Sequence, residues 1–219
     1  MSDITGILSL GTRRDASTWE EGCGALGIKA RLPIKSANPS VADLKTFFAG
    51  KGGWFFFGGH FGGRTLSNER GDVEVRFDAK EVRITAAGTK LVLSKATHEF
   101  SLHEECAVVL WGGCSVCGDP DTVETLRTLF GPHLLLGFAG LTGWRVVDAM
   151  LGGGFMKKGH FFDRLEPGRL DAVTVRDAWM GAALQGYGGG DIEGRFRAVD
   201  PEGQEWKLVK KKINRGRKY

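Results

Sequence analysis

The sequence predicts an α/β fold in which a mainly parallel central sheet is covered by helices on both faces. Apolar runs alternate with stretches of helical character up to residue 57 and again from residue 107, which is typical of β-α-β units. Runs such as Trp-Phe-Phe-Phe at 54–57 are apolar without alternation, as expected for strands buried on both faces. A length of 219 residues, of which 42% are hydrophobic, fits one domain with a sizeable core.

Turn and capping signals order the first part of the chain. Asp15 or Ser17 is expected to cap the first helix, and Gly27 is expected to stop it. The Pro39-Ser40 turn opens the second helix, which the Gly-rich residues 50–53 end. The predicted elements are, in order, a strand at 4–10, a helix at 15–26, a strand at 30–34, a helix at 40–48 and a strand at 54–57.

An antiparallel insertion is predicted at about residues 71–100, because apolar and polar residues alternate there in short runs separated by turns. The α/β pattern then resumes. Its predicted elements are strands at 107–111 and 134–138, helices at 122–130, 144–151 and 175–184, and strands at 193–199 and 205–209. We therefore expect a single domain over residues 1–206, followed by a C-terminal tail at 207–219.

The tail carries the basic character of the chain. The net charge is +4, from 30 Lys and Arg against 26 acids. Residues 207–219 hold seven of the basic residues and no acid, so the rest of the chain is slightly acidic. We interpret this run as a solvated charged terminus. Binding of nucleic acid through the tail is the less favoured alternative.

The sequence gives no indication of a membrane span or a secretory signal. No apolar run approaches the roughly 20 residues that cross a bilayer, and the start Met1-Ser2-Asp3-Ile4 has no basic segment followed by an apolar one. We expect a cytoplasmic location. The four cysteines are then expected to be reduced, so each is a buried apolar residue, a metal ligand or a nucleophile.

Two reactive side chains follow predicted parallel strands. His60 comes after the strand at 54–57, and Cys114 comes after the strand at 107–111. Groups just beyond the carboxyl ends of such strands converge on one edge of the sheet. If the two strands are neighbours, about 5 Å separates them, so the imidazole and the thiol come within reach of each other.

Each of these residues also follows a glycine pair, Gly58-Gly59 or Gly112-Gly113, which allows a sharp turn and close approach of a substrate chain. A cysteine nucleophile needs a basic partner, because the thiolate is the form that attacks. We therefore expect Cys114 and His60 to form a catalytic dyad. The backbone N–H groups of Phe61, Gly62 and Cys114 are the expected oxyanion donors.

These motifs resemble those of the caspase-like cysteine peptidases, and among them the bacterial CHAT-type domains. The resemblance lies in an apolar strand ending in Gly-His, a second apolar strand ending shortly before Cys114, and a third with a helix after it; it covers about residues 4–151. The 54 residues from His60 to Cys114 agree with a caspase spacing of roughly 50. Phe61 stands where the family usually has glycine, and Gly112-Gly113-Cys114-Ser115-Val116 replaces Gln-Ala-Cys-Arg-Gly.

The resemblance implies a caspase-like three-layer fold and a cysteine endopeptidase that needs no cofactor or metal. The implied partners are a protein or peptide substrate and a regulatory protein. Asp148 is a candidate for binding a basic substrate side chain. Phe61 also leaves open a catalytically inactive domain that serves as a protein-binding or scaffolding module.

Two other roles for these residues are less favoured. Cys114 is also the type of small apolar residue that is often buried at a strand end. A zinc site would draw its ligands from His98, His103, Cys106, Cys114 and Cys117. Cys106 and Cys114 flank one predicted strand, which separates them by roughly 26 Å, so we do not expect a metal.

Overall fold

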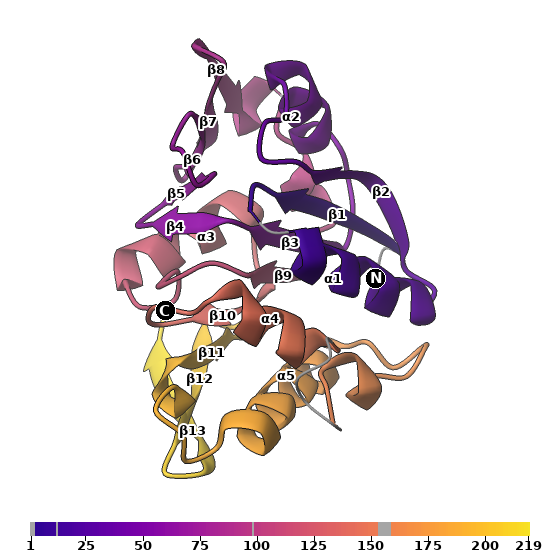
Figure 1. The fold of residues 1–219 in the computed structure, drawn as a ribbon, viewed down its shortest axis with the longest axis vertical. Coiled ribbons are helices and arrows are strands. Elements are labelled where there is room, and N and C mark those ends of the chain that lie inside the picture. Colours follow the sequence, from indigo (N-terminus) through magenta and orange to yellow (C-terminus); the bar gives the residue numbers. More distant parts are fainter. Residues whose placement is uncertain (1–2, 12, 98, 153–158) are drawn as a thin grey trace.

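The computed structural model describes residues 3–11, 13–97, 99–152 and 159–219. Its centre is an eight-stranded sheet with the strand order β13-β12-β11-β10-β9-β3-β1-β2 (Figure 1). Strands β2, β1, β3, β9 and β10 are parallel, and β11 to β13 are antiparallel. The strands are β1 Ile4–Ser9, β2 Lys29–Lys35, β3 Trp54–Gly58, β9 Val108–Trp111, β10 Leu134–Phe138, β11 Phe196–Val199, β12 Gln204–Val209 and β13 Lys212–Lys218. The predicted α/β class is thus confirmed.

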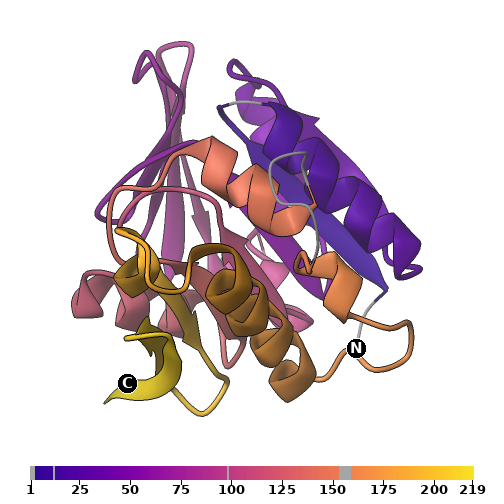
Figure 2. The ribbon, with the colours of Figure 1, turned by 60° about the horizontal axis from the view of Figure 1, so that its bottom comes forward.

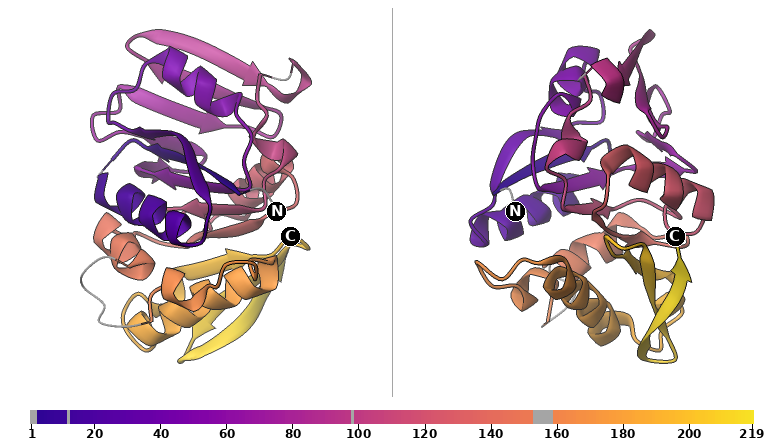
Figure 3. Two further views of the ribbon diagram at one scale, coloured as in Figure 1. Left: turned by 90° about the vertical axis from the view of Figure 1, so that its right-hand side faces the viewer. Right: turned by 180° about the vertical axis from the view of Figure 1, so that it is seen from behind.

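Five helices of the described chain cover the two faces of this sheet. Helices α1 (Arg13–Ala25), α4 (Trp144–Leu151) and α5 (Ala172–Tyr187) pack on one face (Figure 2), and α2 (Val41–Phe48) and α3 (Pro120–Phe130) pack on the other (Figure 3). Successive side chains of a strand point to opposite faces. Trp54 and Phe56 accordingly join the core under α1, whereas Phe55 and Phe57 join the core under α2. This explains why the run 54–57 is apolar throughout.

Local signals account for most helix ends. Ser40 caps α2 in a reciprocal capping box with Asp43, and Asp119 caps α3 with Pro120 in the first turn. Gly27, with a φ of 80°, follows the end of α1. Helix α1 begins at Arg13, so the prediction that Asp15 or Ser17 caps it is wrong. Short 3-10 helices of the described chain are η1 Lys95–Thr97, η2 Leu102–Glu104, η3 Phe162–Arg164 and η4 Glu193–Arg195.

The antiparallel insertion forms a second sheet with the order β4-β5-β6-β7-β8. One face, which includes Val75, Phe77 and Ile84, packs into the core under α2 and α3. The insertion begins at His60 and not at residue 71 as predicted, because the chain leaves β3 through Gly59 and starts the new sheet at once. Its strands are β4 His60–Gly62, β5 Thr65–Ser67, β6 Val73–Phe77, β7 Glu81–Ala86 and β8 Thr89–Ser94.

Residues 207–219 are not a free tail. They complete β12 and form β13, an edge strand of the central sheet. Lys210 and Lys211 both adopt positive φ at the turn of this hairpin, and Leu208 is fully buried. Among the described residues, no helix has the length and apolar character to cross a membrane.

Candidate active site

The two residues predicted as a dyad lie beyond the carboxyl ends of two inner strands of the central sheet. Strands β3 and β9 pair directly and in parallel, with Phe57 opposite Trp111, which confirms the predicted strand neighbours. His60 and Cys114 each come three residues after this pair, so they leave the sheet at the same height. Both line a pocket of about 280 Å³ at the carboxyl ends of the strands.

Two glycines, Gly59 and Gly113, lie where the chain after β3 meets the chain after β9. Gly59 has a φ of 149°, and a Cβ there would lie 2.9 Å from the Ser67 carbonyl oxygen. A Cβ on Gly113 would lie 2.9 Å from Phe61 Cβ and 3.1 Å from the Gly59 carbonyl oxygen. Such distances are too short for a side chain. The glycines therefore allow the chain after β3 and the chain after β9 to pack directly against each other.

The sulfur of Cys114 is held by the loop that follows β10. The thiol donates to the Thr142 carbonyl oxygen at 3.2 Å and accepts from the Thr142 N–H at 3.3 Å. The N–H can also donate to a thiolate, whereas the carbonyl serves only the protonated form. Gly143 and Trp144, at the N-terminus of α4, line the same pocket, and the positive end of a helix dipole favours a nearby anion.

His60 is exposed and is the first residue of β4, where it pairs with Ser67 of β5. Within the described part of the chain, no hydrogen bond joins its ring to the Cys114 sulfur, which bonds to Thr142 instead. Catalytic hydrogen bonds are often long in enzymes without substrate and shorten in the reacting complex. The structure thus brings the two side chains into one pocket.

Of the three expected oxyanion donors, only Cys114 lines this pocket. Phe61 is 8% exposed and packs its ring against Phe77 and Trp111, and Gly62 lies on another surface of the antiparallel sheet. The N–H of Gly112 donates to the Phe57 carbonyl. By contrast, the N–H groups of Gly113 and Cys114 have no acceptor among the residues that the structure describes.

Two carboxylates also line the pocket, and the sequence reasoning missed both. Asp15, in the first turn of α1, is 2% exposed, and Glu69 lies in the loop between β5 and β6. The described lining contains neither Lys nor Arg. Asp15 comes after the carboxyl end of strand β1. The rule that selected His60 and Cys114, that reactive groups lie beyond such strand ends, therefore selects Asp15 as well. Glu69 gave no such signal, because it follows a strand of the antiparallel sheet and reaches the pocket only through the packing of that sheet beside the central one.

Asp148, the candidate for binding a basic substrate side chain, does not line the pocket. Its side chain is fully buried on α4 and faces α1. One carboxylate oxygen accepts a hydrogen bond from Thr18 Oγ1 at 2.7 Å. The other lies 2.9 Å from Arg14 Nε in an ion pair without hydrogen-bond geometry. Asp148 therefore ties two helices together in this structure.

The other cysteines lie in apolar surroundings. Burial raises the pKa of the Cys23, Cys106 and Cys117 thiols, and Cys117 packs in the core under α3. His98, one of the residues considered for zinc, lies outside the described residues. In the described ranges, no three His, Cys, Asp or Glu side chains form a group that could hold a metal.

The fold and the pocket define a Cys-His site at the carboxyl edge of a mainly parallel sheet. No protein-family model matches the chain, and no curated protein matches it significantly.

Proposed function

We propose that the protein is a cysteine endopeptidase of the caspase-like type, with Cys114 as nucleophile and His60 as acid and base. The observation that carries the proposal is that both side chains line one pocket at the ends of paired parallel strands. The free state of all four cysteines supports the cytoplasmic location that we also propose.

The proposed reaction begins when His60 takes the Cys114 proton and the thiolate attacks the scissile carbonyl carbon. The Cys114 N–H group, which has no acceptor in the described chain and belongs to a residue that lines the pocket, stabilises the negative oxygen that develops. His60 then protonates the amine as the C–N bond breaks. Water, deprotonated by His60, attacks the thioester, releases the acid product and restores the thiol.

The acidic lining supports a basic residue beside the scissile bond. Asp15 and Glu69 lie in the same pocket as Cys114, and opposite charges within a partly buried site attract strongly. We propose that these two carboxylates, rather than Asp148, favour a Lys or Arg side chain. Asp15→Asn with Glu69→Gln should lower kcat/KM for a Lys-containing peptide about tenfold relative to its neutral counterpart.

The proposal is tested by thiol labelling and by peptide cleavage. Iodoacetamide at neutral pH should modify Cys114 before Cys23, Cys106 or Cys117, since burial raises the pKa of those three thiols. Mapping by mass spectrometry gives the order. His60→Ala should slow labelling of Cys114, and Cys114→Ala should abolish cleavage of peptides that contain Lys, while Cys117→Ala keeps it. Cleavage that survives Cys114→Ala would remove this residue from the mechanism.

A protein-binding module without catalysis is the second candidate function. The burial of Phe61 in the core, where the resembled family usually has glycine, favours it. In that case, Cys114 would react no faster than a free cysteine of equal exposure, and His60→Ala would leave the rate unchanged.

A further inference from the structure

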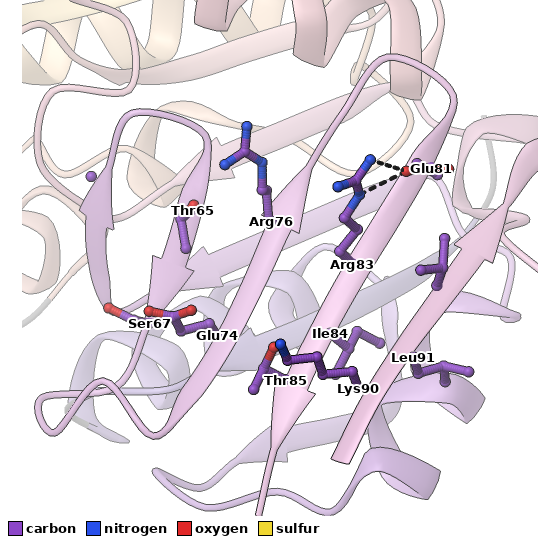
Figure 4. A pocket seen from close by; sticks show the side chains of 12 residues that line it. Thr65, Ser67, Glu74, Arg76, Glu81, Arg83, Ile84, Thr85, Lys90 and Leu91 are labelled. Carbon is purple, nitrogen blue, oxygen red and sulfur yellow. Dashed lines mark hydrogen bonds and ion pairs between the residues drawn. The ribbon is translucent and has the colours of Figure 1, made fainter. Parts of the chain in front are cut away.

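The outer face of the antiparallel sheet carries a broad hollow. It has a volume of about 730 Å³ and lies over all five strands of this sheet. Its side chains stand away from the core, which lies behind the sheet (Figure 4). We define the outer face by the residues that line the hollow on alternating positions: Gly62, Thr65, Ser67, Glu74, Arg76, Glu81, Arg83, Thr85, Lys90 and Val92.

The strand register joins this face to the proposed dyad. His60 pairs with Ser67, Ser67 with Glu74, Glu74 with Thr85, and Thr85 with Lys90. Paired residues of an antiparallel sheet project to the same side, so one row of side chains runs from His60 across the whole sheet. A polypeptide bound at the pocket can therefore continue along the same side of the sheet onto the outer face.

A second row carries paired cations. Arg76 lies directly opposite Arg83, and like charges opposite each other on neighbouring strands repel. Their side chains are 51% and 58% exposed, and both project from the sheet into the hollow (Figure 4). The Asp78 carboxylate lies 3.4–3.6 Å from nitrogen atoms of Arg64, Arg76 and Arg83, and the Glu81 side chain pairs with Arg83. Asp78 Oδ2 thus already lies beside the Nε atoms of both arginines. Ion pairs between such exposed groups contribute little, so the N–H donors of the two guanidinium groups can still bind an anionic group of a ligand.

We propose that the outer face binds an acidic segment of the protein substrate, with Arg76 and Arg83 as its main contacts. This inference rests on the proposed peptidase function. Strand β7 lies three strand spacings from β4, or about 15 Å, which an extended chain covers in about four or five residues. The substrate would thus combine a basic residue in the pocket with acidic residues at that separation from the cleaved bond.

Direct binding to the full chain with Cys114→Ala tests this proposal. The probes are fluorescent peptides of about 14 residues, each with one Lys and one triplet about four residues away from it. The triplet is Glu or Gln, and it is placed before the Lys in one set of peptides and after the Lys in the other. Fluorescence anisotropy at low ionic strength should give a Kd about tenfold lower for a Glu peptide than for its Gln counterpart. Arg76→Glu with Arg83→Glu should remove this preference.

The matched control is Lys29→Glu with Arg31→Glu, which makes the same charge change at exposed positions of β2 in the other sheet. This control should keep the preference for Glu. Equal losses in both double variants, or equal binding of Glu and Gln peptides, would overturn the proposal. Circular dichroism shows whether each double variant is folded. Arg76→Gln with Arg83→Gln removes the positive charges without adding negative ones, and it should also weaken the preference for Glu. In the chain that retains Cys114, iodoacetamide labelling of this residue should not change with Arg76→Glu and Arg83→Glu, so failure of the peptidase proposal is seen separately.

Discussion

His60 and Cys114 reach the same pocket because each follows the last paired residue of its strand by the same number of residues. Each comes three residues after the pair Phe57 and Trp111, which are opposite each other on parallel strands. An insertion of one residue after either strand would move its reactive group by about 3.3 Å and reverse the side to which it points. The glycine pairs before them leave no side chain in the way.

His133 offers a test of burial at the residue scale. It is fully buried, its Nδ1 lies 2.6 Å from the Gly131 carbonyl oxygen, and Nε2 has no partner in the described chain. Burial, with a smaller effect of Arg127, lowers its pKa to about 4, whereas the unfolded chain has a pKa of about 6.5. Stability from this residue is therefore complete above pH 6.5 and is lost as the pH falls toward 4.

The expected loss between pH 6.5 and pH 5 is about 2 kcal/mol, because only the unfolded state binds the proton in that range. Urea unfolding at several pH values measures it. His133→Asn keeps an N–H donor for Gly131 but does not titrate, so its free energy of unfolding should fall less steeply with pH. Parallel curves for both proteins would show that His133 does not contribute.

At the scale of elements, Gly113 permits the contact between the ends of β3 and β9. Gly113→Ala should lower the free energy of unfolding by about 1–3 kcal/mol, because the new Cβ meets Phe61 and the Gly59 backbone. Iodoacetamide labelling of Cys114 should also change its rate. Gly24→Ala, at a helical position with open space around it, is the control and should be neutral or stabilising. Equal effects of the two substitutions would contradict this account.

The contact between α1 and α4 gives a test of the role of Asp148. Asp148→Asn should lower the free energy of unfolding by about 1 kcal/mol, since it removes the ion pair with the half-exposed Arg14. The preference for Lys over a neutral residue in peptide cleavage should remain, because Asp148 does not line the pocket. A loss of preference as large as that expected for Asp15→Asn with Glu69→Gln would instead place Asp148 in the substrate site.

At the scale of the whole molecule, the C-terminal hairpin closes one end of the central sheet (Figure 1). Deletion of residues 210–219 should lower the Tm and promote association, since β12 loses β13, keeps β11 and becomes an open edge of the sheet. Thermal unfolding and size-exclusion chromatography measure both effects. Lys212→Gln with Lys218→Gln keeps the strand and should change the Tm little. An unchanged Tm after the deletion would indicate a dispensable tail.

The apolar runs at 54–57, 107–111 and 134–138 were enough to predict the central strands and their helices, because a strand buried on both faces must be apolar at every position. The C-terminal strand had no such pattern. Its sequence, Lys-Ile-Asn-Arg-Gly-Arg-Lys, is polar because an edge strand lies largely in solvent, and its pairing with β12 is a contact between strands that no apolar pattern announces. The basic run was therefore interpreted as a tail.

The sequence by itself determined the α/β class and the two strand ends that carry His60 and Cys114, since both depend on the local order of apolar residues and glycines. The tertiary structure decided which groups surround them. It brought Asp15, Glu69 and Thr142 to the pocket, buried Phe61 and paired Asp148 with Arg14. Those positions depend on contacts between segments far apart in the chain, which local patterns do not encode.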